Sequence, residues 1–118
     1  CLDAMLEVGI DFIDTANIYG MGVSETVLGK WLASRKPQVV IATKASFVAD
    51  PVRRVDNSEA HLRAELEASL RRMGRHHVEL FYIHRREATR PLEEVIGTLS
   101  RLIAQASLAS PSKRRVHF

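Results

Sequence analysis

The chain has 118 residues, a length that corresponds to one domain or to part of one. Apolar residues make up 46% and charged residues 26%, so the composition is that of a folded globular protein and not of a disordered tail. No apolar run approaches the roughly 18 residues that a membrane span needs, and no signal-peptide pattern opens the sequence. We therefore expect a cytoplasmic protein with no membrane partner.

The charge balance is mildly basic, with 17 Lys and Arg residues against 14 Asp and Glu residues. The basic residues stand in short runs without a stacking motif, and aromatic residues make up only 6% of the chain, so we expect no nucleic-acid partner. The single cysteine, Cys1, allows no internal disulfide and fits a reducing compartment. His61, His76 and His77 lack the spacing of zinc ligands, so we expect no metal site.

The first part of the chain predicts a helix, a strand and a loop. Apolar residues at helical spacing over 2–6 indicate a short helix, and Gly9 ends it. Residues 10–14 have the composition of a short buried strand. A glycine-containing loop follows over residues 17–23.

The middle of the chain predicts a second helix and a second strand. Ser24 is a suitable N-cap for the helix, and Pro37 ends it. Residues 39–43 form a β-branched run that is typical of a strand. A polar loop over residues 50–57 then leads to the next element.

The last predicted elements are a long helix, a third strand and a fourth helix. Asn57 or Ser58 is the N-cap of the long helix, and Gly74 ends it. Residues 78–83 are rich in β-branched and aromatic residues and predict the third strand. Pro91 is expected at the first position of the fourth helix, whose apolar stripe continues to residue 103.

The composition changes after Ile103. Residues 104–118 are rich in Ser and Ala and then basic, so we expect an irregular tail there, with a helical continuation through Ala109 as an open alternative. The sequence therefore predicts one domain over residues 1–103 and a tail over residues 104–118.

The order of the predicted elements indicates the fold class. Three strands that are apolar on both faces alternate with four helices, a pattern typical of a parallel sheet covered by helices. Right-handed crossovers bring the carboxyl ends of all three strands to one edge of such a sheet. An open doubly wound sheet and a (β/α)8 barrel both fit this α/β order.

Polar side chains follow each predicted strand at that edge. Asp14 ends the first strand, Lys44 follows the second and His84 follows the third, while Tyr19 lies in the loop after Asp14. Asp14 and Lys44 can pair, and an ammonium beside a tyrosine is expected to lower the pKa of the phenol. Such a tyrosine can act as a general acid, with His84 positioning a substrate oxygen. The set suits protonation of a carbonyl oxygen, with hydride supplied by a cofactor.

These residues sit in motifs that resemble the aldo-keto reductase family. Order and spacing match from Leu2 to Ile103, and the motifs are GIDFIDTA from Gly9, YG from Tyr19, SE from Ser24, LG from Leu28, IATK from Ile41, SLRRMG from Ser69 and IHR from Ile83. The segment MGVSE from Met21 looks closest to the branch that includes potassium-channel β subunits and bacterial and fungal oxidoreductases.

The resemblance implies a partial (β/α)8 TIM barrel with about three parallel strands and four helices. It implies reduction of an aldehyde or ketone with NADP(H) or NAD(H). By the resemblance, Tyr19 is the general acid, Lys44 lowers its pKa, Asp14 pairs with Lys44 and contacts the nicotinamide ribose, and His84 orients the carbonyl oxygen.

Two departures from the family pattern bear on activity. The family's first strand and everything from its fifth strand onward are not present, and most family contacts to the adenosine phosphate lie in the latter part. We therefore expect a fragment with weak or no NADPH affinity on its own, and self-association through exposed barrel edges. The alternatives are a non-catalytic, cofactor-sensing or regulatory protein similar to the channel β subunits, and an inactive truncated product.

Overall fold

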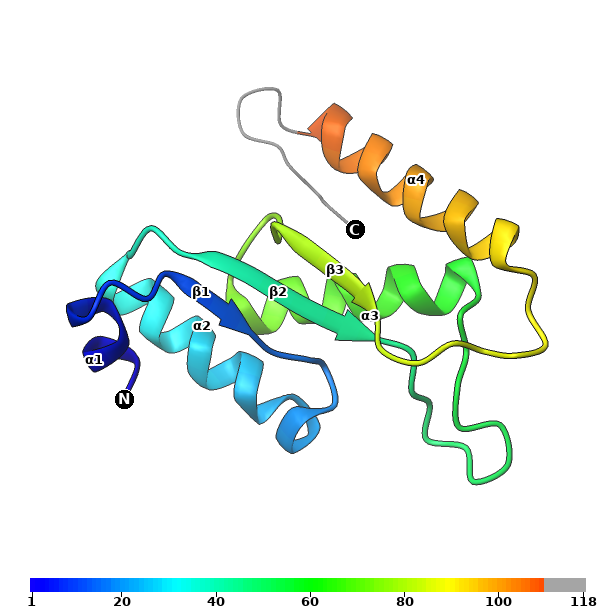
Figure 1. The fold of residues 1–118 in the computed structure, drawn as a ribbon, viewed down its shortest axis with the longest axis horizontal. Coiled ribbons are helices and arrows are strands. Elements are labelled where there is room, and N and C mark those ends of the chain that lie inside the picture. Colours follow the sequence, from blue (N-terminus) through cyan, green and yellow to red (C-terminus); the bar gives the residue numbers. More distant parts are fainter. Residues whose placement is uncertain (110–118) are drawn as a thin grey trace.

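The computed structural model describes residues 1–109, with side chains through residue 105. Its elements alternate along the chain as the sequence predicts (Figure 1). In chain order they are α1 (Leu2–Glu7), β1 (Phe12–Asp14), a 3-10 turn (Tyr19–Gly22), α2 (Val23–Arg35), β2 (Val40–Ala45), α3 (Glu59–Met73), β3 (Leu80–Ile83) and α4 (Leu92–Ala109).

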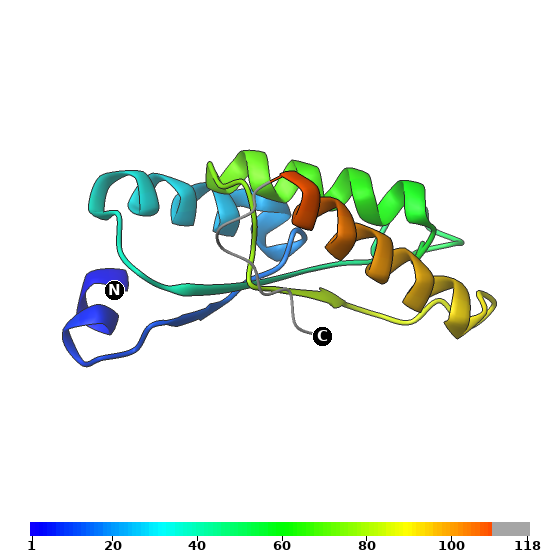
Figure 2. The ribbon, with the colours of Figure 1, turned by 90° about the horizontal axis from the view of Figure 1, so that it is seen from above.

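The three strands form one parallel sheet in the order β1-β2-β3. Helices α2 and α3 lie on one face of this sheet, as Figure 2 shows. Alternate residues of β2, among them Ile41 and Ala45, are buried in the core with Leu28 of α2 and Leu62 of α3. The other face is uncovered in the described part of the chain, where Phe12 and Tyr82 are exposed although both are large and apolar.

This one-sided cover separates the two architectures that the sequence leaves open. A doubly wound sheet carries helices on both faces, whereas a barrel carries them only on its outer face. The described helices α2 and α3 follow the barrel arrangement. The prediction of three parallel strands with four helices is confirmed.

Helices α2 and α3 approach each other at Gly29. A Cβ atom built on Gly29 would lie 2.3 Å from the carbonyl oxygen of Arg72 and 2.9 Å from the Cα of Met73. Both are backbone atoms, which cannot move aside as a flexible side-chain end can. Glycine at position 29 therefore sets how closely the two helices pack, and the LG and SLRRMG motifs meet at this contact.

A buried ion pair lies near the same contact. Glu25 of α2 is fully buried, and its carboxylate accepts hydrogen bonds from Arg72 Nε at 2.7 Å and from Thr43 Oγ1 at 2.5 Å. Arg72 also donates to Ser69 Oγ at 3.1 Å. The network joins both helices to β2, the central strand that carries Lys44.

The helix ends follow the predictions at α3 but not at α2. Ser58 caps α3 by accepting from the backbone N–H of His61, and Gly74 ends it in the left-handed conformation with φ of 63°. The prediction that Ser24 caps α2 is wrong, because Gly22 is the N-cap and its φ of 91° belongs to the left-handed region. Ser24 is the second residue of α2, and its hydroxyl forms a hydrogen bond with that of Thr15 at 2.9 Å.

The fourth helix extends beyond the predicted end of the domain. α4 begins at Leu92, one residue after Pro91, and continues to Ala109. Of the two alternatives that the sequence leaves open for residues 104–109, the structure has the helical continuation and not the irregular segment, in a stretch where alanine, the strongest helix former, is frequent. The rest of the predicted tail, residues 110–118, lies outside the described residues.

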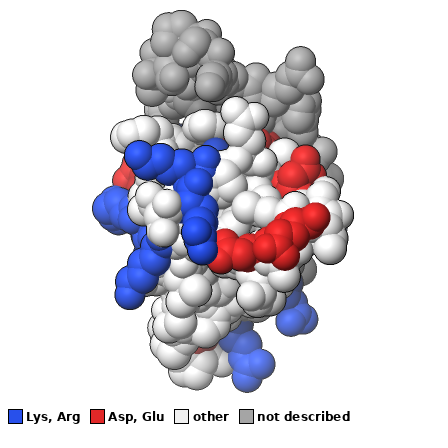
Figure 3. All heavy atoms as spheres, turned by 90° about the vertical axis from the view of Figure 1, so that its left-hand side faces the viewer, with Lys and Arg blue, Asp and Glu red and all other residues white. Residues whose placement is uncertain are grey.

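Helix α1 is joined to α2 at the end of the sheet where the strands begin. Asp3 accepts a hydrogen bond from Trp31 Nε1 at 2.8 Å and pairs with Arg35 at 2.9 Å. Figure 3 views this end of the molecule and shows basic side chains standing beside acidic ones. No helix in the part of the chain that the structure describes is long and apolar enough to cross a membrane.

Candidate active site

The carboxyl ends of the three strands bring the four predicted site residues together. Asp14 is the last residue of β1, Lys44 lies near the end of β2, and His84 follows the last residue of β3. The strand register pairs Asp14 with Ala42 and Lys44 with Tyr82. Lys44 therefore lies two residues beyond the partner of Asp14, and His84 lies two residues beyond the partner of Lys44. Tyr19 reaches the same edge from the 3-10 turn after β1.

The Lys44 ammonium lies at the centre of this cluster. Nζ is 2.8 Å from the Asp14 carboxylate and 3.5 Å from the Tyr19 hydroxyl oxygen. It also donates to the backbone carbonyl of Thr15 at 3.0 Å. One cation is therefore shared among a carboxylate, a carbonyl and a phenol.

The surroundings of Lys44 keep its side chain charged. Burial of the ammonium lowers the pKa of Lys44, but the hydrogen bond and charge of Asp14, followed by those of Tyr19, outweigh burial. The pKa of Lys44 therefore lies above its ordinary value. A positive charge is present beside the Tyr19 hydroxyl at any physiological pH.

His84 stands between two aromatic rings. Its ring centroid is 5.8 Å from that of Tyr19 and 5.0 Å from that of Phe47, both in edge-on geometry. Its Nδ1 is buried without a hydrogen-bond partner. Burial first, and then the charge of Lys44, lower the pKa of His84, with Asp14 opposing them. The imidazole is therefore neutral at pH 7 and can act as a hydrogen-bond donor or acceptor.

A hollow of about 420 Å³ lies over these groups on the uncovered face of the sheet. It is lined by Phe12, Asp14, Lys44, Tyr82, Ile83 and His84. Polar groups at one end of an apolar floor are the usual composition of a small-molecule site.

Sequence analysis missed two contributors to this cluster. Phe47 packs against His84, and the carbonyl of Thr15 accepts from Lys44. Phe47 lies beyond the end of β2, so strand alternation gives no signal for it. A backbone carbonyl gives no sequence signal of any kind. Within the described residues, no group of three or more His, Cys, Asp or Glu side chains could hold a metal ion.

The lowered pKa of His84 predicts a pH-dependent stability. The unfolded chain takes up the histidine proton near the ordinary pKa of 6.5, and the folded chain does so only at lower pH. The free energy of unfolding should therefore fall as the pH drops below about 6.5, and level off once His84 is protonated in the folded chain as well.

Urea unfolding between pH 8 and pH 5 measures this effect. His84→Gln should reduce the loss of stability on acidification, whereas His76→Gln, at an exposed position, should retain it. An unchanged pH dependence in His84→Gln would contradict the assigned burial of the imidazole.

Comparison with known proteins agrees with this architecture. The sequence profile of the Aldo/keto reductase family matches residues 1–107. The chain is 35% identical over 119 residues to an aryl-alcohol dehydrogenase (NADP(+)) of Phanerodontia chrysosporium, covering 91% of this chain and 31% of the relative. It is 36% identical over 106 residues to an uncharacterized oxidoreductase of Bacillus subtilis, covering 80% of this chain and 32% of the relative.

Solved structures give the same result. An aldo-keto reductase from Bacillus halodurans, in its holo form, superposes with a TM-score of 0.80 at 29% identity, covering 89% of this chain and 36% of that one. A glycerol dehydrogenase from Gluconobacter oxydans also gives a TM-score of 0.80, at 33% identity, with 88% and 34% covered. The chain spans about a third of the length of these relatives. It belongs to the aldo/keto reductase family, and its three strands and four helices are a portion of that family's barrel.

Proposed function

We propose that this chain carries the proton-transfer groups of a nicotinamide-dependent reductase of aldehydes or ketones. The observation that carries the proposal is the position of Lys44 Nζ, 2.8 Å from Asp14 and 3.5 Å from the Tyr19 hydroxyl, at the end of an open hollow. Family membership supports the reaction class.

Each of the four side chains has a distinct role in this proposal. Tyr19 donates its hydroxyl proton to the carbonyl oxygen of the substrate, since its phenol is the acidic hydroxyl of the cluster. The Lys44 ammonium stabilises the phenolate that remains after the transfer. Asp14 keeps Lys44 charged and in place, and neutral His84 holds the carbonyl oxygen by a hydrogen bond.

The residues around the hollow fit the nicotinamide end of NADP(H). The Asp14 side chain is 49% exposed beside the apolar Phe12 and Tyr82, so it offers acceptors for ribose hydroxyls next to a surface suited to a planar ring. Two relatives support NADP(H) over NAD(H). NADP(+) is named as the cofactor of the aryl-alcohol dehydrogenase of Phanerodontia chrysosporium and of an aldo-keto reductase of Schizosaccharomyces pombe. When bound, the cofactor supplies the hydride to the carbonyl carbon.

Tyr19→Phe tests this proposal. The substitution removes the transferable proton and keeps the ring, so kcat for NADPH-dependent reduction of an aldehyde should fall by about 10² to 10⁴. The unfolding midpoint should stay near that of the unmodified protein, because Tyr19 is exposed and the hydrogen bond of its hydroxyl with Lys44 is long, at 3.5 Å. Turnover is followed by the loss of NADPH absorbance in the full-length protein.

The same assay separates the reductase from the regulatory alternative. Near-normal turnover by Tyr19→Phe would contradict the assignment of Tyr19 as general acid. Saturable NADPH binding with no turnover of a panel of aldehydes and ketones would favour a cofactor-sensing protein instead.

A further inference from the structure

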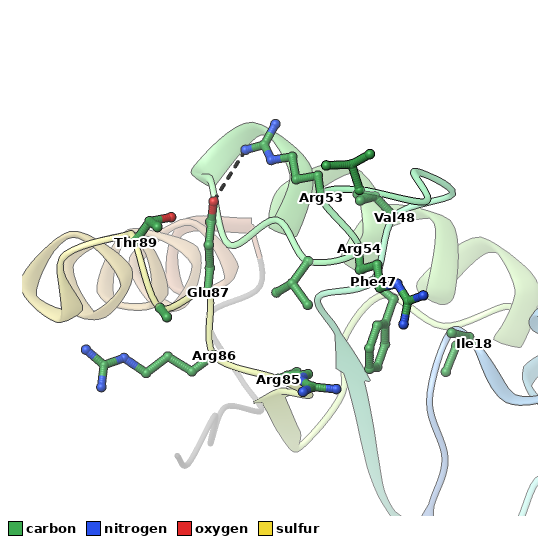
Figure 4. A pocket seen from close by; sticks show the side chains of 12 residues that line it. Ile18, Phe47, Val48, Arg53, Arg54, Arg85, Arg86, Glu87 and Thr89 are labelled. Atoms are coloured by element: carbon green, nitrogen blue, oxygen red, sulfur yellow. Dashed lines mark ion pairs between the residues drawn. The ribbon is translucent and has the colours of Figure 1, made fainter.

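A second cavity, of about 680 Å³, lies on the other side of Phe47, a residue that packs against His84 (Figure 4). Its walls come from the loops that follow β2 and β3, together with Ile18, which precedes Tyr19. Phe47 lines this cavity and also packs against the ring of His84 at 5.0 Å. A substrate whose carbonyl lies at Tyr19 and His84 can therefore extend past Phe47 into this space.

The cavity is rich in positive charge. Two pairs of arginines line it, Arg53 and Arg54 from one loop and Arg85 and Arg86 from the other. Arg53 is neutralised by Asp56 at 3.2 Å and Glu87 at 3.5 Å. Among the described residues, no acidic side chain pairs with any of the other three.

Two of these arginines lie beside Phe47. The backbone N–H of Val48 donates to the carbonyl of Arg54 at 3.0 Å, and the backbone N–H of Arg85 donates to Ser46 Oγ at 3.1 Å, so both arginines are bonded to a neighbour of Phe47 in the chain. In the view of Figure 4, the side chain of Arg86 extends away from Phe47. Val52 and Val55 add apolar side chains to the lining of the cavity. A guanidinium group can bind a carboxylate through two parallel hydrogen bonds, and it is less strongly hydrated than an ammonium.

Hydrogen bonds between the two loops fix the arginine pairs relative to each other. The backbone N–H of Asn57 donates to Glu87 Oε2 at 2.8 Å, and the backbone N–H of Glu87 donates to Asn57 Oδ1 at 2.7 Å. Asn57 is buried and its Nδ2 donates to Ser46 Oγ at 3.0 Å. Because the loops are held before a ligand arrives, less conformational entropy is lost on binding.

We propose that this cavity, the arginine pocket, binds an anionic group of the substrate through Arg54 and Arg85. The inference rests on the proposed reductase function and narrows it to carbonyl compounds with a carboxylate on an apolar body. The carbonyl lies at Tyr19, and the carboxylate lies past Phe47 between the two guanidinium groups.

A binding measurement tests the pocket without requiring turnover. The full-length protein, labelled with ¹⁵N, is titrated with 4-acetylbenzoate and separately with its neutral methyl ester. We expect saturable shifts of the backbone amides of Phe47, Val55 and Ala88 with the carboxylate, and binding at least fivefold weaker with the ester. Arg54→Gln and Arg85→Gln should each weaken carboxylate binding at least fivefold. Arg71→Gln, the same change at an exposed position on α3, should not.

Reduction of 4-carboxybenzaldehyde and of methyl 4-formylbenzoate completes the test. We expect kcat/KM to be at least tenfold higher for the carboxylate, and Arg54→Gln and Arg85→Gln to remove that preference, whereas Arg71→Gln should retain it and leave reduction of both aldehydes within about twofold. Equal kcat/KM for both aldehydes, without shifts at the pocket amides, would overturn the inference and leave the reductase function standing. Carboxylate binding at the pocket without reduction of either aldehyde would overturn the reductase function instead.

Discussion

Replacement of Lys44 by Met should lower kcat for carbonyl reduction by about three orders of magnitude, within the range that general acid–base groups contribute. Methionine keeps most of the aliphatic chain and removes the ammonium that lies 3.5 Å from the Tyr19 hydroxyl. The phenolate left after proton transfer then has no cation beside it, and Asp14 loses its partner at 2.8 Å. Steady-state kinetics with NADPH and an aldehyde measure the effect.

A matched substitution separates this loss from a general effect of removing a lysine. Lys30 is exposed on α2, and Lys30→Met should leave kcat within about twofold. The pH dependence of kcat should also change in Lys44→Met, because the group that stabilises the phenolate is gone. A kcat within threefold of the unmodified protein in Lys44→Met would remove Lys44 from the mechanism.

Arg72→Met should lower the free energy of unfolding by about 3 kcal/mol or more, the usual consequence of removing one partner of a buried ion pair. Glu25 is fully buried, and the Arg72 guanidinium at 2.7 Å is the cation that balances its charge. Without it, Thr43 is the one side chain among the described residues that still donates a hydrogen bond to the carboxylate. Urea unfolding followed by circular dichroism gives the difference.

Two further variants show whether the unpaired charge is the cause. Arg71→Met, at the exposed neighbouring position, should change the free energy of unfolding by less than about 0.5 kcal/mol. The double variant Glu25→Leu with Arg72→Met should recover most of the stability, since it replaces both partners by apolar groups. A double variant as unstable as Arg72→Met alone would assign the loss to packing between α2 and α3 rather than to charge.

The strands and the long helix could be predicted because their signals are local. The β-branched run before Lys44 and the Ser58 and Gly74 ends of α3 each satisfy the backbone within a few residues. The start of α2 could not be predicted in this way. Gly22 is its N-cap because the 3-10 turn over Tyr19–Gly22 ends in a left-handed residue directly before the helix. The Ser24 hydroxyl is bonded to that of Thr15 instead of capping the helix.

The candidate site also has a part that could be predicted from local signals and a part that could not. Asp14, Lys44 and His84 could be placed at one edge because parallel strands end on the same side, and the structure brings them there with Tyr19. The arginine pocket had no such signal. Its two pairs lie in loops separated by all of α3 and β3, and contacts between residues far apart in the sequence, such as the hydrogen bonds between Asn57 and Glu87, bring those loops together.

The strand order β1-β2-β3 also bears on how the chain reaches this structure. Among the three described strands, β2 pairs with β1 and β3 pairs with β2, and none of them is inserted between two earlier ones. A chain leaving the ribosome can therefore add one helix and one strand at a time to a sheet edge that already exists. The Lys44 and Asp14 pair can form as soon as β2 has emerged, before β3 brings His84 to the edge.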